Sequence, residues 1–210
     1  MCVFAAATRL LVVWNRTTGE AFVANDGQRG GQRGGQKSGW PDRTGPDGGR
    51  PARAGLSEAI LHFLERGVSL VVSSSDRANR PRVGRALAVQ VPADGAWIGV
   101  CLDRTANAAL LAAVAETGRF ALAATEPSTH LSIQLTGEDA TVTAADAETT
   151  ILAARHVDAF AAELALIGYG DAFTRALMAH DPATLAMVRF RPSRLYDQTP
   201  GPKAGTAVPP

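Results

Sequence analysis

A series of short apolar segments closed by turn-forming residues is the feature that most restricts how this chain can fold. Three of them follow one another between residues 68 and 102, separated only by the turn sequences DRANRP and PADG. Connections this short join antiparallel strands, because a parallel pair needs a crossover of a dozen residues or more. In all, six strands are predicted: residues 68–75, 82–91, 96–102, 119–125, 131–143 and 185–192.

Helical patterns interrupt this series without separating the strands into a regular alternation. The predicted helices are residues 56–67, 105–118, 147–168 and 171–181. The first has Ser57 as a possible cap and Gly67 as a stop. Hairpin-linked strands with only short helices between them favour an antiparallel barrel over a doubly wound parallel sheet.

Both ends of the chain differ in composition from its middle. Residues 27–55 hold ten glycines in twenty-nine positions and the short repeat GQRGGQRGGQK. We expect residues 1–55 to be a disordered extension, because such a segment cannot offset its ordering entropy by burial. An RGG-like nucleic-acid arm, a flexible tail and translation from a misassigned start are the alternative interpretations. The folded domain is then predicted over 56–197, followed by an irregular Pro/Gly-rich tail over 198–210.

Charge, cysteine and histidine content exclude several classes of protein. The net charge of +1 gives no field that would attract nucleic acid or an anionic membrane. Cys2 and Cys101 form neither a disulfide framework nor a CxxC site, which is typical of a reducing compartment, and the four histidines lack metal-site spacing. No run reaches the length of a membrane span, and the apolar opening MCVFAAATRLLVVW is a weak signal-peptide match. We therefore expect a cytoplasmic protein without a metal ion.

Arg85 stands out in the strand RVGRALAVQV. With a period of two, it shares a face with valine and leucine residues only. A guanidinium on an apolar face needs an anion, because burying it alone is costly. That anion could be a carboxylate of this chain, a carboxylate across a dimer interface or a bound phosphate. A bulge near Gly84 would instead turn Arg85 outward.

Polar residues alternate along the strand at 131–143. Ser132, Gln134 and Thr136 share one face, whereas the residues between them are apolar. A row of this kind lines a wet cavity or hydrogen-bonds the edge of a heterocycle. Its other interpretation is the ordinary solvent face of a strand.

Two further places could hold an anion. Arg104 and Thr105 lie where a strand passes into a helix, so backbone N–H groups, the helix dipole and a hydroxyl could bind one there, although an ordinary helix cap is the alternative. Lys203 lies in TPGPKAG, which is not a P-loop. This stiff tail could bring Lys203 over a site, or it could remain loose.

Four segments taken together resemble the pyridoxamine 5′-phosphate oxidase-like proteins, which are flavin-binding split-barrel families. The segments are residues 67–91, 97–105, 118–142 and 188–196. The resemblance covers most of residues 56–197 and lies in the pattern of strands. It implies a mainly β, α+β fold, namely a six-stranded antiparallel split β-barrel. It also implies a homodimer that holds flavin mononucleotide (FMN) in clefts at the subunit interface.

The resemblance also assigns residues to the cofactor. In that family an arginine on the second strand helps to hold the FMN phosphate, in a segment that ends in lysine. RALAVQ matches this segment, with Arg85 in the arginine place and Leu87 within it. Gln90 stands where the lysine would be, which removes one positive charge. Gln134, together with Ser132, matches the polar strand row that faces the flavin ring.

A second phosphate-binding segment of the family, serine-arginine-lysine after the third strand, is poorly matched. Arg104 and Thr105 stand there without a lysine, and Lys203 of the tail could replace the missing charge. A phosphate held by few cations should bind less tightly, by about 1–3 kcal/mol for each lost charge-assisted bond.

Three functional hypotheses follow. The leading one is an FMN-dependent oxidoreductase of unknown substrate, in which the flavin carries the hydride or the electrons. The second is a non-catalytic binding or sensory protein for flavin, haem or another planar ligand on the same scaffold. In the third, the cleft is empty and Arg85 pairs with a carboxylate such as one from GEDA, residues 137–140. The sequence assigns no catalytic residue.

Overall fold

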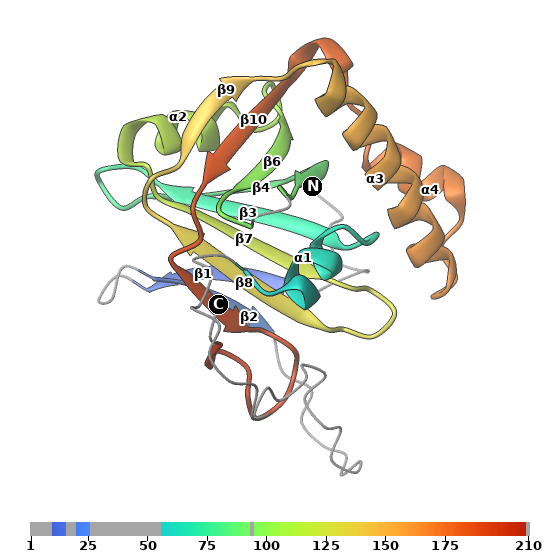
Figure 1. Ribbon diagram of the computed structural model, residues 1–210, viewed down its shortest axis with the longest axis horizontal. Coiled ribbons are helices and arrows are strands. Elements are labelled where there is room, and N and C mark those ends of the chain that lie inside the picture. Colours follow the sequence, from blue (N-terminus) through green and yellow to red (C-terminus); the bar gives the residue numbers. More distant parts are fainter. Residues whose placement is uncertain (1–9, 16–19, 26–55, 93–94, 209–210) are drawn as a thin grey trace, which may run out of the picture.

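The computed structural model describes residues 10–15, 20–25, 56–92 and 95–208. Figure 1 shows its elements. The strands are β1 (Leu10–Asn15), β2 (Glu20–Asn25), β3 (Ser69–Ser75), β4 (Pro81–Arg85), β5 (Ala88–Gln90), β6 (Ile98–Asp103), β7 (Phe120–Thr125), β8 (Ser132–Gly137), β9 (Thr141–Ala144), β10 (Leu185–Phe190), β11 (Arg194–Asp197) and β12 (Ala207–Val208). The helices are α1 (Glu58–Leu64), α2 (Ala108–Thr117), α3 (Ala147–Ala165) and α4 (Asp171–Leu177), with a 3-10 turn at Pro182–Thr184.

The strands from β3 onward form two antiparallel sheets that share strand paths. The larger sheet has the order β12-β11-β8-β7-β3-β4, the smaller one has the order β5-β6-β10-β9, and β1 pairs only with β2. β4 continues into β5, β8 into β9 and β10 into β11, so three paths pass from one sheet to the other. Followed by pairing, the paths β3, β4–β5, β6, β10–β11, β8–β9 and β7 return to β3 and close a barrel.

The path from β4 to β5 changes partner within two residues. The Ala86 N–H donates to the Leu70 carbonyl oxygen at 3.1 Å, and the next N–H, that of Leu87, donates to the Cys101 carbonyl oxygen at 2.8 Å. The chain therefore leaves β3 and joins β6 at this point. One uninterrupted strand over 82–91, as the sequence predicts, is wrong.

This junction also changes which residues point outward. Arg85 lies opposite Val71 on the outer face of the larger sheet, whereas Ala86 lies in the inner core. Leu87 and Ala88 then both pack outside the barrel, so two consecutive residues face the same way. As a result Val89 and Val91 pack against the inner core and do not share a face with Arg85.

The inside of the barrel is filled by alternate residues of both sheets and by two helices. Leu70 and Val72 of β3, Leu122 of β7 and Leu135 of β8 are almost fully buried there. α1 and α2 each contribute apolar residues to the same core, such as Phe63 of α1. Figure 1 shows α2 toward the left end of the larger sheet and α1 toward its right end.

α3 covers the outer face of the smaller sheet and forms a second apolar cluster with it. Val157 and Phe160 pack there against Cys101 of β6. The helix begins at a capping box, in which Asp146 accepts from the Thr149 N–H at 2.8 Å and the Thr149 hydroxyl is 3.3 Å from the Asp146 N–H. These bonds satisfy N–H groups that the first turn leaves without helical partners.

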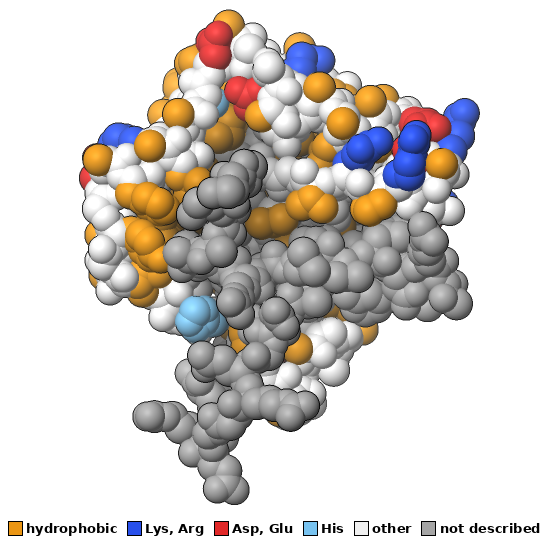
Figure 2. All heavy atoms as spheres, turned by 180° about the vertical axis from the view of Figure 1, so that it is seen from behind, with side chains coloured by type: hydrophobic (Ala, Val, Ile, Leu, Met, Phe, Trp, Pro, Cys, Tyr) orange, Lys and Arg blue, Asp and Glu red, His pale blue; other side chains and the backbone are white. Residues whose placement is uncertain are grey.

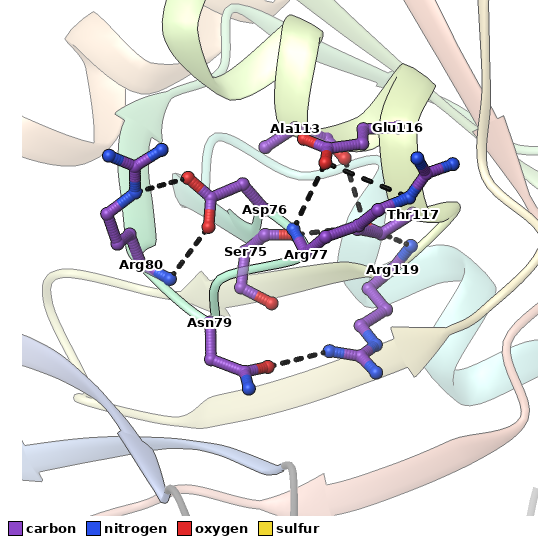
Figure 3. A network of polar contacts seen from close by, with 9 residues as sticks. All are labelled: Ser75, Asp76, Arg77, Asn79, Arg80, Ala113, Glu116, Thr117 and Arg119. Carbon is purple, nitrogen blue, oxygen red and sulfur yellow. Dashed lines mark hydrogen bonds and ion pairs between the residues drawn. The ribbon is translucent and has the colours of Figure 1, made fainter.

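The tip of the β3–β4 hairpin is held by polar contacts, which Figure 3 shows. Asp76 accepts from the backbone N–H of Arg80 at 2.9 Å and from its Nε at 2.7 Å. Arg119, next to the end of α2, donates to Asn79 at 3.1 Å. Figure 2 shows Lys and Arg side chains gathered at upper right, the side on which this hairpin lies. The hairpin tip is at the opposite end of β3 from Arg85.

The α+β class with a six-stranded antiparallel sheet is confirmed. Three further local predictions differ from the structure. Residues 131–143 form two strands, β8 and β9, which belong to different sheets. Ser57 precedes α1 as predicted, but its side chain makes no capping hydrogen bond. Part of the predicted irregular tail pairs with β11 as β12. Among the described helices, none has the length and apolar character needed to cross a membrane.

Candidate functional site

The outer face of the larger sheet carries a row of residues that crosses five strands. Register pairs Arg85 with Val71, Val71 with Ala123, Ala123 with Gln134, and Gln134 with Tyr196. Directly opposed residues of antiparallel strands point to the same face. Arg85 and Gln134 therefore lie on one face, three strand spacings or about 14 Å apart along the sheet.

Arg85 is half-buried at the end of β4, where its Nη1 lies 3.3 Å from the Ser69 hydroxyl. Burial lowers the pKa of its guanidinium. Within the described ranges Arg85 makes no ion pair, and Asp139 of the GEDA segment binds Arg191 instead. The structure therefore gives no carboxylate from that segment to Arg85.

A hydroxyl without a partner lies on the same face. Ser73 is two positions beyond Val71 on β3, opposite Val83 and Ala121. Its side chain is buried, and its oxygen has no hydrogen-bond partner among the described residues. A buried hydroxyl is normally satisfied, so this one is a candidate for contact with a polar ligand.

Ser132 and Gln134 are both buried on this face, and each has a polar neighbour. The Ser132 hydroxyl lies 2.9 Å from the Thr125 hydroxyl and donates to the His130 carbonyl oxygen. The Gln198 amide lies 3.4 Å from the Gln134 side-chain oxygen. The polar row on β8 predicted from the sequence is thus part of a hydrogen-bonded surface, not a solvated strand face.

Leu87 and Gln90 lie farther along the second strand path. Leu87 is buried in the cluster under α3. Gln90 is half-buried and lines a pocket of about 450 Å³ between α1, β5 and α3. Because of the change of face at the β4–β5 junction, Arg85 and Gln90 both lie outside the barrel, although their odd spacing would separate them in a regular strand.

The turn with Arg104 and Thr105 lies beside β4 but already holds a carboxylate. Both residues are exposed, and Asp103 accepts from the Ala106 N–H at 2.8 Å. The backbone hydrogen bond from Ala106 holds the pKa of Asp103 below its usual value. The Asn107 side chain reaches the Arg85 carbonyl oxygen at 3.5 Å. The turn thus adjoins Arg85, but a second anion there would be repelled by Asp103.

Lys203 lies in a tail that folds back on the sheet. It is exposed, and its carbonyl oxygen accepts from the Thr206 N–H at 3.0 Å. The Gly205 N–H donates to the Asp197 carbonyl oxygen at 2.7 Å. The same tail passes Ser132, whose carbonyl oxygen accepts from Gln198. The tail therefore lies near the polar strand row, and the role of Lys203 stays a prediction.

Sequence reasoning did not single out four residues of this face: Ser69, Ser73, Thr125 and Gln198. A signal for two of them was present, because the segment VSLVVSSS places Ser69 and Ser73 on one face when read with a period of two. Thr125 and Gln198 become neighbours of the row only through strand pairing and the return of the tail.

The described part of the chain contains no group of three His, Cys, Asp or Glu side chains that could hold a metal ion. The polar groups of the outer face are a guanidinium, hydroxyls and amides, with the phenol of Tyr196 at the end of the row. Such groups bind phosphate oxygens and the polar edge of a ring, and the described residues of the row include no carboxylate and no imidazole.

No protein-family model and no curated protein sequence matches the chain. Solved structures are similar to it. HupZ of Group A Streptococcus is 13% identical, with 71% of this chain and 99% of that chain covered and a TM-score of 0.43. A pyridoxamine 5′-phosphate oxidase-related, FMN binding protein from Nostoc punctiforme is 14% identical, with 75% of this chain and 100% of that chain covered and a TM-score of 0.42. HutZ, the heme storage protein from Vibrio cholerae, is 15% identical, with 68% of this chain and 94% of that chain covered and a TM-score of 0.39. All three are similar to this chain at low sequence identity, and one of them is described as pyridoxamine 5′-phosphate oxidase-related and FMN binding.

Proposed function

We propose that this chain is an FMN-binding split-barrel protein that acts as a flavin-dependent oxidoreductase on a small molecule. The phosphate of the nucleotide would lie at Arg85, and its ring would extend over the outer face of the larger sheet toward Gln134. The bound flavin supplies hydride or electron transfer. The residues of this chain would bind the phosphate, orient the ring and exclude water.

One observation carries the proposal. Arg85 is half-buried, its guanidinium contacts the Ser69 hydroxyl, and the described residues supply no carboxylate to it. A structural arginine in such a position is normally paired, because desolvation of a lone charge is costly. A phosphate would supply the missing charge and accept two parallel hydrogen bonds.

The other polar groups of this face fit the remainder of the nucleotide. FMN carries its phosphate and its ring at opposite ends of a ribityl chain, so it needs polar groups spread along a surface. Ser73 offers an unsatisfied hydroxyl on the strand that pairs with β4. Gln134 offers a buried amide three strands away from Arg85, beside Gln198.

The small number of cations near Arg85 limits the affinity of the chain for FMN. Gln90 stands where the related families have a lysine, and it lies in the pocket under α3. Arg104 is exposed beside the Asp103 carboxylate. Arg85 is then the main positive charge available, and we expect FMN to bind more weakly than in a protein with two or three cations.

We also propose a homodimer with the flavin in clefts between subunits, as the resemblance implies. Sedimentation of the full chain checks this at the concentrations used for FMN titration. A monomer that binds FMN stoichiometrically would contradict the interface position of the cleft and leave the role of Arg85 intact.

The test begins with the visible absorbance spectrum of the purified protein and continues with FMN titration. Two flavin bands support the proposal, a Soret band indicates haem, and a blank spectrum with no binding on titration contradicts both. We expect Arg85→Ala to weaken FMN binding about 10- to 100-fold, because it removes charge-assisted hydrogen bonds.

Arg77→Ala is the matched control, since Arg77 is an exposed arginine of the hairpin at the other end of β3. Equal affinity of the two variants for FMN would remove the role of Arg85. If FMN is bound, anaerobic reduction by NADH or NADPH distinguishes an enzyme from a carrier.

A non-catalytic ligand-binding protein is the second candidate. It is favoured by the lack of any carboxylate or imidazole among the described residues of the outer row, and by the small number of cations. Flavin that stays oxidised with both nicotinamide donors would support this function.

A further inference from the structure

The pocket between α1, β5 and α3 is separate from the row of residues that crosses the larger sheet. Its volume is about 450 Å³, within the range of about 300–1,000 Å³ that small-molecule sites occupy. One side is apolar, with Leu152 and Ala159 of α3, whereas Val89 and Val91 line the pocket at β5 with their side chains packed against the inner core. This surface can cover the hydrocarbon part of a ligand.

Two hydrogen-bond donors from different elements line the same pocket without partners. Arg155 of α3 is exposed and makes no ion pair within the described residues. The half-buried amide of Gln90 on β5 makes no hydrogen bond to any described residue. Convergent donors beside an apolar surface are the usual arrangement for orienting a small ligand. Their common acceptor would be an oxyanion.

The charges around the pocket favour a single negative charge on the ligand. Arg66 is neutralised by Glu126, whose carboxylate lies 2.7 Å away. Arg155 and Glu65 then remain as one positive and one negative charge. A doubly charged phosphate would be repelled by Glu65 and would have only Arg155 to compensate it, whereas a carboxylate needs one cation.

His156 fixes one wall of the pocket as a neutral surface. Its Nε2 lies 2.9 Å from the Val68 carbonyl oxygen, which requires a proton on this nitrogen. Burial lowers the pKa of the ring, so it stays neutral at physiological pH. The imidazole therefore adds no second positive charge, which agrees with a monovalent ligand.

We infer that the pocket between α1, β5 and α3 binds an apolar monocarboxylate, with its carboxylate on Arg155 and Gln90 and its hydrocarbon part on Leu152 and Ala159. This site does not depend on FMN. It gives the chain a place for an organic acid beside the second strand path, where Gln90 belongs to the pocket rather than to the row that contains Arg85.

Hydrocinnamate is a suitable probe, since it joins one carboxylate to a flat apolar body. Calorimetric titration of the full chain should show saturable binding both without and with excess FMN. The neutral amide of the same acid should bind at least about tenfold more weakly, because it lacks the negative charge that Arg155 would bind. Inorganic phosphate should bind more weakly by a similar factor, because it lacks the hydrocarbon part. Binding of phosphate as tight as that of hydrocinnamate would overturn the inference.

Arg155→Gln is the decisive variant. It removes the charge at an exposed helix position, and we expect hydrocinnamate affinity to fall about tenfold or more. Gln90→Leu should weaken binding by a smaller factor, and Arg77→Gln on the distant hairpin should leave it unchanged. Wild-type affinity in Arg155→Gln, or no saturable binding by the wild type, would refute the site. Because FMN is titrated separately, failure here is distinguishable from failure of the flavin proposal.

Discussion

At the scale of single residues, Gly67 lies where the backbone of the barrel closely approaches the backbone of α3. It lies between α1 and β3, and a Cβ atom built on it would overlap the carbonyl group of Ala159 on α3. The approach involves two backbones, so a rotamer change cannot relieve it. The absence of a side chain at Gly67 lets α3 lie close to the start of β3.

Gly67→Ala should therefore lower the free energy of unfolding by about 1–3 kcal/mol, the cost of forcing extra atoms into a packed contact. Gly170→Ala is the matched control, because a Cβ there meets nothing within 4 Å. Urea unfolding of both variants checks this. Equal midpoints for Gly67→Ala and the wild type would show that α3 can shift at no cost.

The surroundings of Cys101 determine the reactivity of its thiol. It is fully buried between β5 and β10, and burial, together with the nearby Asp103, raises the pKa of its thiol to about 12. The thiolate is the reactive form, so the native protein should not use this thiol.

Iodoacetamide at neutral pH should leave Cys101 unmodified in the native protein and label it fully in denaturant. Peptide mass spectrometry measures the alkylation of Cys101 separately from that of Cys2, which lies outside the described residues. Rapid native labelling of Cys101 would mean that the smaller sheet opens readily.

At the scale of elements, α3 is joined to the start of β3 through His156. The ring lies among apolar residues of the helix and bonds the Val68 carbonyl oxygen at 2.9 Å, one residue before β3 begins. A proton on Nδ1 would charge a buried ring. Burial accordingly lowers its pKa, and the opposing effect of the bond to Val68 is smaller.

The free energy of unfolding should fall as the pH drops below about 6.5, the ordinary histidine value. There the unfolded chain binds a proton that the folded chain does not, and the loss approaches about 1.4 kcal/mol per pH unit until the folded pKa is reached. His156→Gln, whose amide can still donate to Val68, should show a shallower pH dependence. His62→Gln, at an exposed position of α1, is the control for replacing a histidine side chain by glutamine.

At the scale of the whole molecule, the barrel closes within the part of the chain that follows residue 55. Every strand pair of the barrel lies between β3 and β11, and the helices that fill or cover it lie between α1 and α4. Figure 1 shows α3 and α4 together on one side of this barrel. The hydrophobic side chains at the left of Figure 2 lie on the same side of the molecule.

Removal of residues 1–55 should leave a chain that still folds, since both apolar clusters are formed by later residues. We expect cooperative thermal unfolding and a far-ultraviolet circular dichroism spectrum that retains its β-sheet character. A molten or aggregated product would show that the first 55 residues contribute to the core. FMN titration of the shortened chain then tells whether they contribute to the cofactor site.

The elements could be predicted from the sequence because their signals are local. Alternating apolar residues and short turns lie within a few residues of the structure they produce. Six strands and four helices follow from such signals, and the number of strands with their hairpin connections is enough to exclude a parallel sheet. The polar row at Ser132 and Gln134 is local in the same sense.

Sheet membership and the surroundings of each site residue were decided only by the tertiary structure. Nothing within RALAVQ indicates that Ala86 bonds β3 while Leu87 bonds β6. That exchange of partners reverses the alternation and puts Arg85 and Gln90 on the outside of the barrel. The pocket at Gln90 needs α3, which lies more than fifty residues later in the chain. Side-chain alternation is a property of one strand, whereas its direction relative to the core depends on hydrogen bonds to strands that are remote in sequence.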